Sequence, residues 1–277
     1  MRTVRIEPLG VGVRTRRVDR ANAFAAENGN VMPDTDLYLR GADTLLASWE
    51  EYARGASSAA VLRSPGVRIA VFPDGPERAF YNNALLERDL TASDRAAAVE
   101  AMEGAYSTAG VARFAAWVHE SDEAMRHELE RRGYTLDTST RAMGMVLDDL
   151  SVPEPELEVE PTNWSDYLHF LAALGAPSGL LARTDPTSFH IIVGRVDGET
   201  VAAAIALDFE GDCGIYNVGT LEHGRRRGLG TAVTAFHLHQ ARARGCRTAT
   251  LQSTERAERL YGSVGFRDLG LILEYAP

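Results

Sequence analysis

A glycine-containing turn separates a strand pattern from a helix pattern near the C-terminal end of this 277-residue chain. The apolar residues 215–220 predict a strand, and residues 232–244 have the spacing of a helix. The turn between them holds three arginines and two glycines, in the order Arg225-Arg226-Arg227-Gly228-Leu229-Gly230-Thr231. The first turn of a helix has free backbone N–H groups and partial positive charge, and glycine lets an anion approach them closely. The turn therefore predicts a binding site for a phosphate-bearing ligand.

The composition is that of a folded protein with an acidic surface. Of the residues, 45% are hydrophobic and 25% are charged, as in soluble globular proteins, and this length suits one large domain or two ordinary ones. The formal net charge of −10 disfavours nucleic acid as a partner, because a phosphate backbone needs a basic surface. A cationic substrate such as an amine would suit this charge, which can equally serve only to keep the protein soluble.

The sequence shows no membrane or secretion signal. No apolar run approaches the ~20 residues of a membrane helix, and residues 1–8 lack the apolar segment of a secretion signal. Cys213 and Cys246 are too few for a disulfide framework or a metal cluster, and we expect both to be small buried residues. These observations predict a cytoplasmic protein with no membrane partner and no metal.

A proline-containing segment divides the chain into two parts of similar size. Pro153 and Pro155, with acidic neighbours, disfavour a helix or a central strand over residues 151–156. We therefore predict a domain at residues 1–150, a linker at 151–156 and a second domain at 157–277.

Hydrophobic spacing predicts the same kinds of element in both parts. In the second part it predicts helices at 162–174, 232–244 and 255–264, and strands at 189–194, 201–207, 214–220, 248–252 and 271–275. In the first part it predicts helices at 45–52, 91–106 and 121–132, and strands at 67–72, 79–86, 112–118 and 142–147. Antiparallel hairpins followed by alternating helices and strands indicate mixed sheets flanked by helices.

One pattern occurs twice along the chain. A strand, a serine, a helix and a glycine followed by an aromatic residue recur with an offset of 132 positions. This offset aligns Ser121 with Ser253 and Gly133 with Gly265. We interpret the chain as two copies of one fold.

Two motifs of the second part point to a known family. Residues 225–230 fit the pattern Arg/Gln-x-x-Gly-x-Gly/Ala after a fourth strand, and Ala257, Leu260-Tyr261 and Gly265-Phe266 follow in the expected order. In these motifs, and in residues 216–221, the segment 157–277 resembles the GNAT superfamily of N-acetyltransferases. The resemblance implies an α+β fold with α/β/α layers and two GNAT-like domains. Each would be a mixed, largely antiparallel sheet flanked by helices, with splayed central strands in the C-terminal copy.

The resemblance also implies acetyl-CoA as the cosubstrate. Its pyrophosphate would lie on the backbone N–H groups of residues 226–231, and its pantetheine arm would pair with the end of the fourth strand. Thr254 stands where the family often has a residue that touches this arm, although capping of the following helix is an alternative role. The implied cofactor-binding residues are Val218, Gly219, Thr220, Arg225, Arg226, Arg227, Gly228, Leu229, Gly230, Thr231, Thr254 and Tyr261.

Tyr261 is the implied catalytic acid, because a positioned phenol can protonate the departing thiolate. The alternative is a core tyrosine packed with Leu260 and Val264. Some family members place a basic glutamate early in the fourth strand, but the matching residue here is Gly214. The sequence leaves open a water-mediated proton transfer, an amine that binds already neutral, or one of four candidate bases: Glu222, Asp208, Glu210 and His190.

The first copy lacks these features. Residues 87–91, Glu-Arg-Asp-Leu-Thr, stand in place of the basic turn without its glycines, and their acidic residues would repel a phosphate. Leu129 aligns with Tyr261. We therefore expect this copy to be non-catalytic, with one acetyl-CoA bound per chain. It would instead cover the cleft of the second copy, and Tyr81, Asn82 and Asn83 are either part of that wall or buried polar residues of a strand.

These observations favour an N-acetyltransferase that acts on a primary amine of a small molecule, such as an antibiotic or a biosynthetic intermediate. Two alternatives stay open: the same chemistry on a protein or peptide, and a non-catalytic sensor of acyl-CoA. The sequence does not specify the acceptor, and its specificity is expected to lie around residues 167–185. The oligomeric state is also open, and a monomer is compatible with two halves that form a pseudo-dimer.

Overall fold

A computed structural model describes residues 32–56, 58–74, 81–156, 158–175 and 181–277. The predictions made for residues 1–8 and 79–80, and for part of the segment 167–185, lie outside this range. Residues Met32–Pro277 form one compact unit. None of the described helices is both long enough and apolar enough to cross a membrane.

The order of elements repeats along the chain: a helix, three strands, a helix, a strand, a helix and a strand. The first set is α1 (Asp34–Arg54), β1 (Ala60–Ser64), β2 (Val67–Val71), β3 (Asn83–Leu86), α2 (Ala92–Ala109), β4 (Ala115–His119), α3 (Glu123–Arg131) and β5 (Thr135–Val146). After the short strand β6 (Val159–Pro161), the second set is α4 (Trp164–Leu174), β7 (His190–Val196), β8 (Glu199–Phe209), β9 (Asp212–Thr220), α5 (Leu229–Ala243), β10 (Thr248–Ser253), α6 (Glu258–Ser263) and β11 (Arg267–Ala276). We call these two sets the N-terminal half and the C-terminal half.

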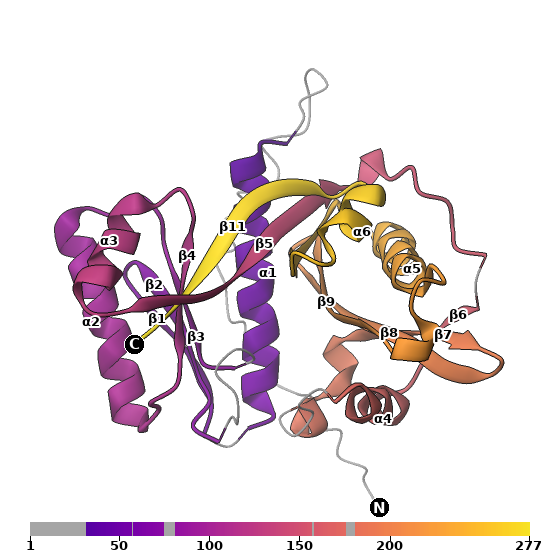
Figure 1. Ribbon diagram of the computed structural model, residues 1–277, viewed down its shortest axis with the longest axis horizontal. Coiled ribbons are helices and arrows are strands. Elements are labelled where there is room, and N and C mark those ends of the chain that lie inside the picture. The colour runs from indigo at the N-terminus through magenta and orange to yellow at the C-terminus, as the bar shows by residue number, and fades with distance from the viewer. Residues whose placement is uncertain (1–31, 57, 75–80, 157, 176–180) are drawn as a thin grey trace, which may run out of the picture. The chain divides into compact units, whose positions relative to one another are not determined.

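All the described strands join in one sheet, in the order β1-β2-β3-β4-β11-β5-β10-β9-β8-β7-β6 (Figure 1). The pairs β3–β4 and β9–β10 are parallel, and the other neighbours are antiparallel. The mixed, largely antiparallel sheet that the sequence predicts is therefore confirmed.

The two halves exchange their last strands in the middle of this sheet. β11 of the C-terminal half pairs with β4 of the N-terminal half, for example Leu273 with Val118. β5 of the N-terminal half pairs with β10, for example Met143 with Leu251. The exchange converts two sheets into one, and it leaves only β1 and β6 as edge strands among the described residues.

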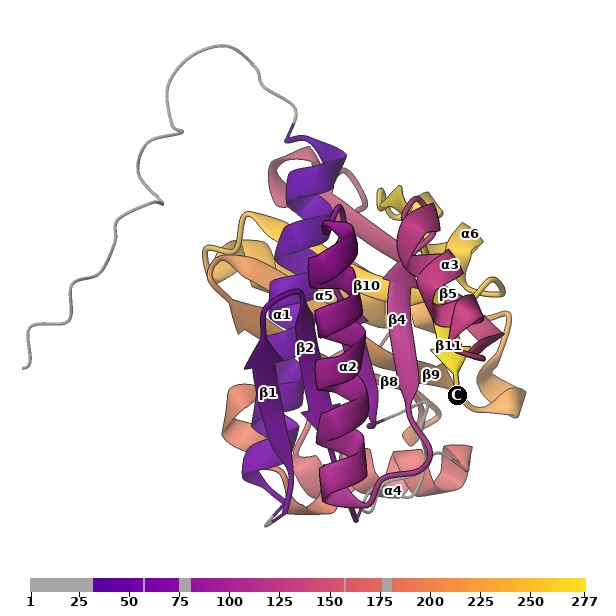
Figure 2. The ribbon, with the colours of Figure 1, turned by 90° about the vertical axis from the view of Figure 1, so that its left-hand side faces the viewer.

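Helices cover both faces of the sheet. α1 and α4 share one buried apolar cluster with the strands, which includes Trp49, Trp117 and Tyr167. α2 and α3 pack on the opposite face of the N-terminal strands, and α5 and α6 pack on the opposite face of the C-terminal ones. Figure 2 shows α1 and α2 on opposite sides of β2. α1 contacts strands of both halves, so it lies over their junction (Figure 1).

Several element boundaries differ from the predicted ones. α1 begins at Asp34 and not at residue 45, since its first turns carry Gly41 and polar residues that hide the helical spacing. β3 begins at Asn83 and not at residue 79, because the Asn82 amide binds the backbone of Phe72 and closes the connection from β2. α6 begins at Glu258 because residues 254–257 form a turn.

Two other sequence predictions concern cysteines and the linker. Cys213 and Cys246 are buried and free, as predicted. Residues 151–156 form no helix or strand, and the division into domains at this segment stays a prediction.

Candidate functional site

β9 and β10 separate soon after they pair. Residues 212–214 of β9 pair with residues 248–250 of β10, so the last partners are Gly214 and Thr250. β9 then continues to Thr220 and β10 to Ser253, without further pairing between them. We call the point after Gly214 and Thr250 the fork. The predicted splay of the central strands is confirmed, and beyond the fork one edge of β9 is free to pair with an extended ligand.

A bulge in β9 lies next to the fork. Tyr216 pairs with Ile205 of β8 and Gly219 pairs with Ala203, so β9 has one extra residue between these pairs. Asn217 has the positive φ of 53°, a conformation that side chains rarely adopt. A bulge turns backbone groups out of the ladder and is common beside binding sites. Here it exposes backbone polar groups on the part of β9 where the pantetheine arm is expected.

The predicted phosphate turn has the geometry that an anion requires. α5 begins after Gly228, whose φ of 79° suits glycine and which supplies no side-chain cap. The backbone N–H groups of residues 226–231 donate to no other described residue. These free donors and the helix dipole converge on one place, so this end of α5 can bind a phosphate.

The three arginines of the turn are exposed. Arg225 donates from Nε to the carbonyl oxygen of Thr220 over 3.3 Å, which ties the turn to the end of β9. Arg226 and Arg227 form no ion pair with another described residue and are available to an anionic ligand. A Cβ at Gly230 would lie 3.0 Å from Leu260, so glycine here lets α6 approach the turn.

Tyr261 of α6 lies at the fork, on the face that α5 covers. It shares an apolar cluster with Ile215 and Leu251, the first residues of β9 and β10 beyond the fork. Its ring contacts Phe266 edge to face at 5.9 Å. Its hydroxyl makes no hydrogen bond to another described residue, and burial raises its pKa to about 12. The ring is thus a core residue, as in the alternative interpretation, while the phenol is neutral and keeps a proton that it can donate.

The candidate bases lie on different elements, and which of them takes the proton stays a prediction. Asp208 accepts hydrogen bonds from Arg244 at 2.6 and 2.9 Å and lies 3.3 Å from His190. Burial favours a raised pKa for Asp208, but the bonds from Arg244 and His190 outweigh it and hold the pKa well below its usual range. Such a carboxylate is a poor base near neutral pH. Glu210 lies in the turn before β9, and Glu222 is exposed in the turn after it.

Two further predictions concern single residues. Thr254 is exposed and does not cap α6, whose N-cap is Ala257, so the capping interpretation is wrong. The contact of Thr254 with the pantetheine arm stays a prediction. Tyr81, Asn82 and Asn83 are all buried, and Asn82 is fully engaged with Phe72 as a buried polar residue.

Sequence reasoning missed the contribution of the N-terminal half to the fork. Asp212, at the start of β9, is buried and accepts hydrogen bonds from Thr248 and Thr250 at 2.6 Å and from Thr44 of α1 at 2.7 Å. These bonds fasten α1 beside the fork. No local pattern links Thr44 to a strand 168 positions away, so the contact could not be found without the fold.

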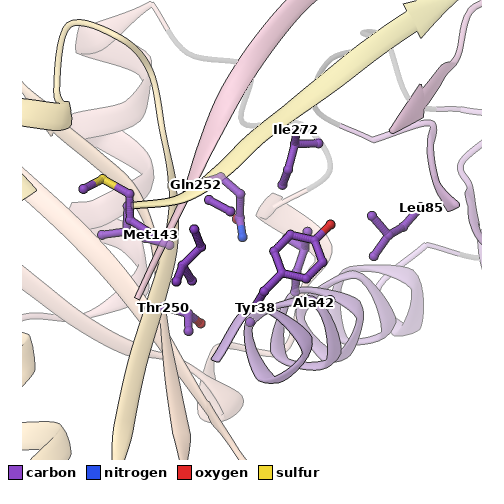
Figure 3. Close-up of a pocket in the computed structure, with 12 residues that line it drawn as sticks. Tyr38, Ala42, Leu85, Met143, Thr250, Gln252 and Ile272 are labelled. Carbon is purple, nitrogen blue, oxygen red and sulfur yellow. The ribbon is translucent and has the colours of Figure 1, made fainter. Parts of the chain in front are cut away.

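α1 packs tightly against β10 on this face. The cavity between them has a volume of about 10 Å³, which holds no more than a water molecule. Figure 3 shows Tyr38 and Ala42 of α1 on one side of it and Thr250 and Gln252 on the other. The described residues thus leave little space between α1 and β10.

One protein-family model matches part of this chain. Residues 145–266 match the model of the acetyltransferase (GNAT) family. No curated protein matches the sequence of this chain.

Several solved structures share the fold. A GCN5-related N-acetyltransferase from Kribbella flavida is 20% identical with a TM-score of 0.65, over 86% of this chain and 94% of that one. A GCN5-related N-acetyltransferase from Sphaerobacter thermophilus is 18% identical with a TM-score of 0.56, over 84% of each chain. A tandem GNAT protein from the clavulanic acid biosynthesis pathway is 12% identical with a TM-score of 0.56, over 89% of this chain and 96% of that one.

Proposed function

We propose that this chain, whose residues 145–266 match the model of the acetyltransferase (GNAT) family, is an acetyl-CoA-dependent N-acetyltransferase for a primary amine of a small molecule. In this reaction the amine nitrogen forms a bond to the acetyl carbon, and the bond from that carbon to sulfur breaks. The amine loses one proton and the sulfur gains one, so the products are an N-acetyl amine and free CoA. Bound acetyl-CoA supplies an activated acyl group.

The free backbone of β9 and α5 carries this proposal. The N–H groups of residues 226–231 and the exposed Arg226 and Arg227 would hold the pyrophosphate. The unpaired edge of β9 at Val218, Gly219 and Thr220 would pair with the pantetheine arm. Both features lie on one continuous segment, as a ligand with a phosphate end and an amide-bearing arm requires.

The groups at the fork fit acyl transfer. Backbone N–H groups at the bulge around Asn217 would polarise the acyl carbonyl, in the manner of an oxyanion hole. Tyr261 holds a proton at neutral pH and has no competing partner among the described residues, so it can protonate the departing sulfur. A sensor without turnover has no need of such a phenol.

A small acceptor fits the covered face of the fork better than a protein chain does. α1 lies beside the fork, and Leu174 of α4 fills the place where a Cβ at Gly219 would stand, at 2.7 Å. An acceptor must therefore fit beneath helices of both halves, which suits a compact amine.

Release of CoA from acetyl-CoA, measured with a panel of small amines and a parallel panel of basic peptides, tests the proposal. We expect release of CoA with small amines, and a product that is heavier than the amine by one acetyl group in place of one hydrogen. We also expect about one acetyl-CoA bound per chain, because of the two corresponding helices only α5 begins without a side-chain cap, whereas Thr91 caps α2. Release with peptides alone would assign the protein class of acceptor. Tight binding of acetyl-CoA without transfer to any amine would leave the sensor as the function.

A further inference from the structure

A second tyrosine lies at the fork, on the face opposite Tyr261. The hydroxyl of Tyr216 occupies the place where a Cβ at Gly214 would stand, and Thr44 of α1 adjoins the same place. Any side chain at position 214 would displace the Tyr216 hydroxyl, so only glycine at this position leaves room for it. The strand position at which some relatives carry a basic glutamate thus presents a phenol from two residues further along.

The Tyr216 hydroxyl is buried and has no hydrogen-bond partner within normal geometry among the described residues. Leaving a buried hydroxyl unpaired costs free energy, so a ligand that forms a hydrogen bond with it would be stabilised. The neighbours of Tyr216 supply no free hydrogen-bond donor. Ser48 of α1 lies within hydrogen-bonding reach of the phenol, but the single Ser48 hydroxyl proton is already donated to the carbonyl of Leu45 at 2.6 Å. Asp212 is close too, but it already accepts three threonine hydroxyls.

The Tyr216 phenol is neutral near physiological pH. Burial raises its pKa well above 10, Asp212 and Tyr52 add to this effect, and hydrogen bonding with Ser48 acts in the opposite direction without reversing it. A neutral phenol cannot serve as the missing base. Its oxygen can accept a hydrogen bond from an amine N–H, and this orients the nitrogen lone pair.

The location of Tyr216 follows from the direction of β9. The phosphate turn begins beyond Thr220, so an arm that pairs with residues 218–220 runs back along β9 towards the fork. The four residues from Thr220 back to Tyr216 span about 13 Å of strand. The acyl end of the arm would therefore arrive at the bulge, beside Tyr216 on one face and Tyr261 on the other.

We propose that Tyr216 is a positioning residue for the acceptor, whose oxygen accepts a hydrogen bond from the amine N–H and turns the nitrogen lone pair towards the acyl carbon. This inference rests on the proposed function and extends it to the acceptor. Helices of both halves form the surroundings, because Ser48 and Thr44 come from the N-terminal half and Tyr216 from the C-terminal half.

The same surroundings indicate the class of acceptor. Tyr216 packs against a buried cluster to which Tyr52, Tyr167 and Phe189 belong. The hydroxyl of Tyr167 is likewise buried and has no partner in normal hydrogen-bond geometry among the described residues, although the Asn217 side chain lies close enough to lower its pKa. The buried rings disfavour an ammonium ion and favour the neutral amine, which is the form that attacks, and the nearby Asp212 is already engaged by three threonine hydroxyls. A site lined by aromatic rings and a few tyrosine hydroxyls suits a primary amine attached to an apolar or aromatic group. A sugar or a polyamine would have polar groups left without partners in such a site.

Two variants remove this interaction by different routes. Tyr216→Phe deletes the hydroxyl, and Gly214→Ala keeps the hydroxyl but displaces it with a new Cβ. Tyr134→Phe and Gly104→Ala are the matched controls in the N-terminal half, since Tyr134 bonds only Glu103 and a Cβ at Gly104 meets open space. Each variant is assayed with phenethylamine, glucosamine and spermidine. Phenethylamine binding to the CoA complex is also measured by calorimetry, and folding by thermal unfolding.

We expect kcat/KM for phenethylamine to fall about 30-fold in Tyr216→Phe, as for the loss of one hydrogen bond in a buried site. In Tyr216→Phe the KM for acetyl-CoA and the unfolding temperature should stay unchanged, and calorimetric binding of the amine should weaken in parallel. Both controls should match the unaltered chain in amine kinetics and amine binding, while Gly104→Ala, inside α2, should unfold at the same or a higher temperature. Gly214→Ala should show the same fall in kcat/KM for phenethylamine. If this variant does not fold, the result for Tyr216→Phe alone tests the inference. Of the three amines, phenethylamine should be the best substrate.

Unchanged amine kinetics in Tyr216→Phe would overturn this inference alone, and so would a loss confined to acetyl-CoA binding. A preference for glucosamine or spermidine would overturn the assigned acceptor class. Failure of the unaltered chain to acetylate any amine would overturn the proposed function together with this inference.

Discussion

The two halves differ at the start of the helix that follows their third strand, which is α2 in the N-terminal half and α5 in the C-terminal half. In the N-terminal half, the side chain of Thr91 caps α2 by accepting a hydrogen bond from the Asp94 N–H at 3.2 Å. In the C-terminal half, Gly228 supplies no side chain, and the N–H groups of residues 226–231 stay free among the described residues. One helix is closed by its own sequence, and the other is left open to an anion.

The strands before these helices differ in the same sense. β3 ends at Leu86, one residue after its last pair with β4, whereas β9 continues six residues past its last pair with β10. An unpaired strand edge and an uncapped helix therefore occur together in the C-terminal half only, among the described residues. Recurrence of the topology alone therefore does not create the candidate cofactor site, which is found only where both backbone segments lack internal partners among the described residues.

A carboxylate in the first turn of each helix tests this difference most severely. Gly230 and Ser93 each stand two residues after the N-cap, and an aspartate there should favour either helix through its dipole. In Gly230→Asp the carboxylate also repels the pyrophosphate, so acetyl-CoA affinity should fall about 1000-fold, or about 4 kcal/mol. Ser93→Asp should leave affinity unchanged. Calorimetry gives both values and the stoichiometry.

Equal losses of acetyl-CoA affinity in the two variants, or no loss in Gly230→Asp, would refute the assignment of a single phosphate site at the start of α5. Thermal unfolding serves as the control for this pair. Ser93→Asp removes no cap or buried contact and should unfold at or slightly above the temperature of the unaltered chain. Gly230→Asp gains the same dipole interaction but brings a Cβ to 3.0 Å from Leu260, so its unfolding temperature should stay close to that of the unaltered chain without exceeding it.

The sequence predicted the local parts of this site well. The order of strand, turn and helix around residues 225–231 and the burial of both cysteines follow from composition and spacing within short windows. The fork was predicted only through the family resemblance. Local spacing was least reliable at element ends, where Asn82 and Thr254 take part in turns that hydrophobic periodicity does not register.

The long-range features could not be predicted from spacing. Exchange of β5 and β11 between the halves depends on which edges meet, and both strands would have the same pattern in either arrangement. The contact of Thr44 with Asp212 likewise depends on α1 crossing the junction. For this reason sequence reasoning assigned the N-terminal half a covering role without identifying the residues that reach the fork.

The second prediction uses the contrast between Tyr261 and Leu129, which match in position on α6 and α3. Leu129 is fully buried in the N-terminal half, while Tyr261 presents an unpaired hydroxyl at the fork. Tyr261→Phe should lower kcat about 100-fold, the usual cost of removing a general acid, with acetyl-CoA affinity nearly unchanged. Because the Tyr261 pKa is about 12, the unaltered enzyme should show no loss of activity from this group up to pH 9. Steady-state kinetics across pH, with Tyr106→Phe as a control, measure both.

The third prediction concerns strain that the two turns share. Arg226 and Asp89 each lie two residues before an N-cap and have positive φ values of 61° and 62°. Glycine at either position should raise stability by up to about 1 kcal/mol, with less gain at Asp89 because aspartate tolerates this conformation better. Only Arg226→Gly should weaken acetyl-CoA binding, by about 5-fold, through loss of one charge near the phosphates. Urea unfolding and calorimetry separate the two effects, and weaker binding in Asp89→Gly would contradict the comparison.

The smallest effect is expected at Asp208, which joins β8 to α5 through Arg244. The lowered pKa of this carboxyl means that its ion pair stabilises the fold above the unfolded pKa of about 4 and loses this contribution as pH falls. Asp208→Asn should therefore cost about 1 kcal/mol of unfolding free energy at pH 7 and progressively less below pH 4. Since Asp208 is already paired, kcat should not change. A large drop in kcat with an intact fold would instead return Asp208 to the role of base and place the proton acceptor on the α5 face of the fork, opposite Tyr216.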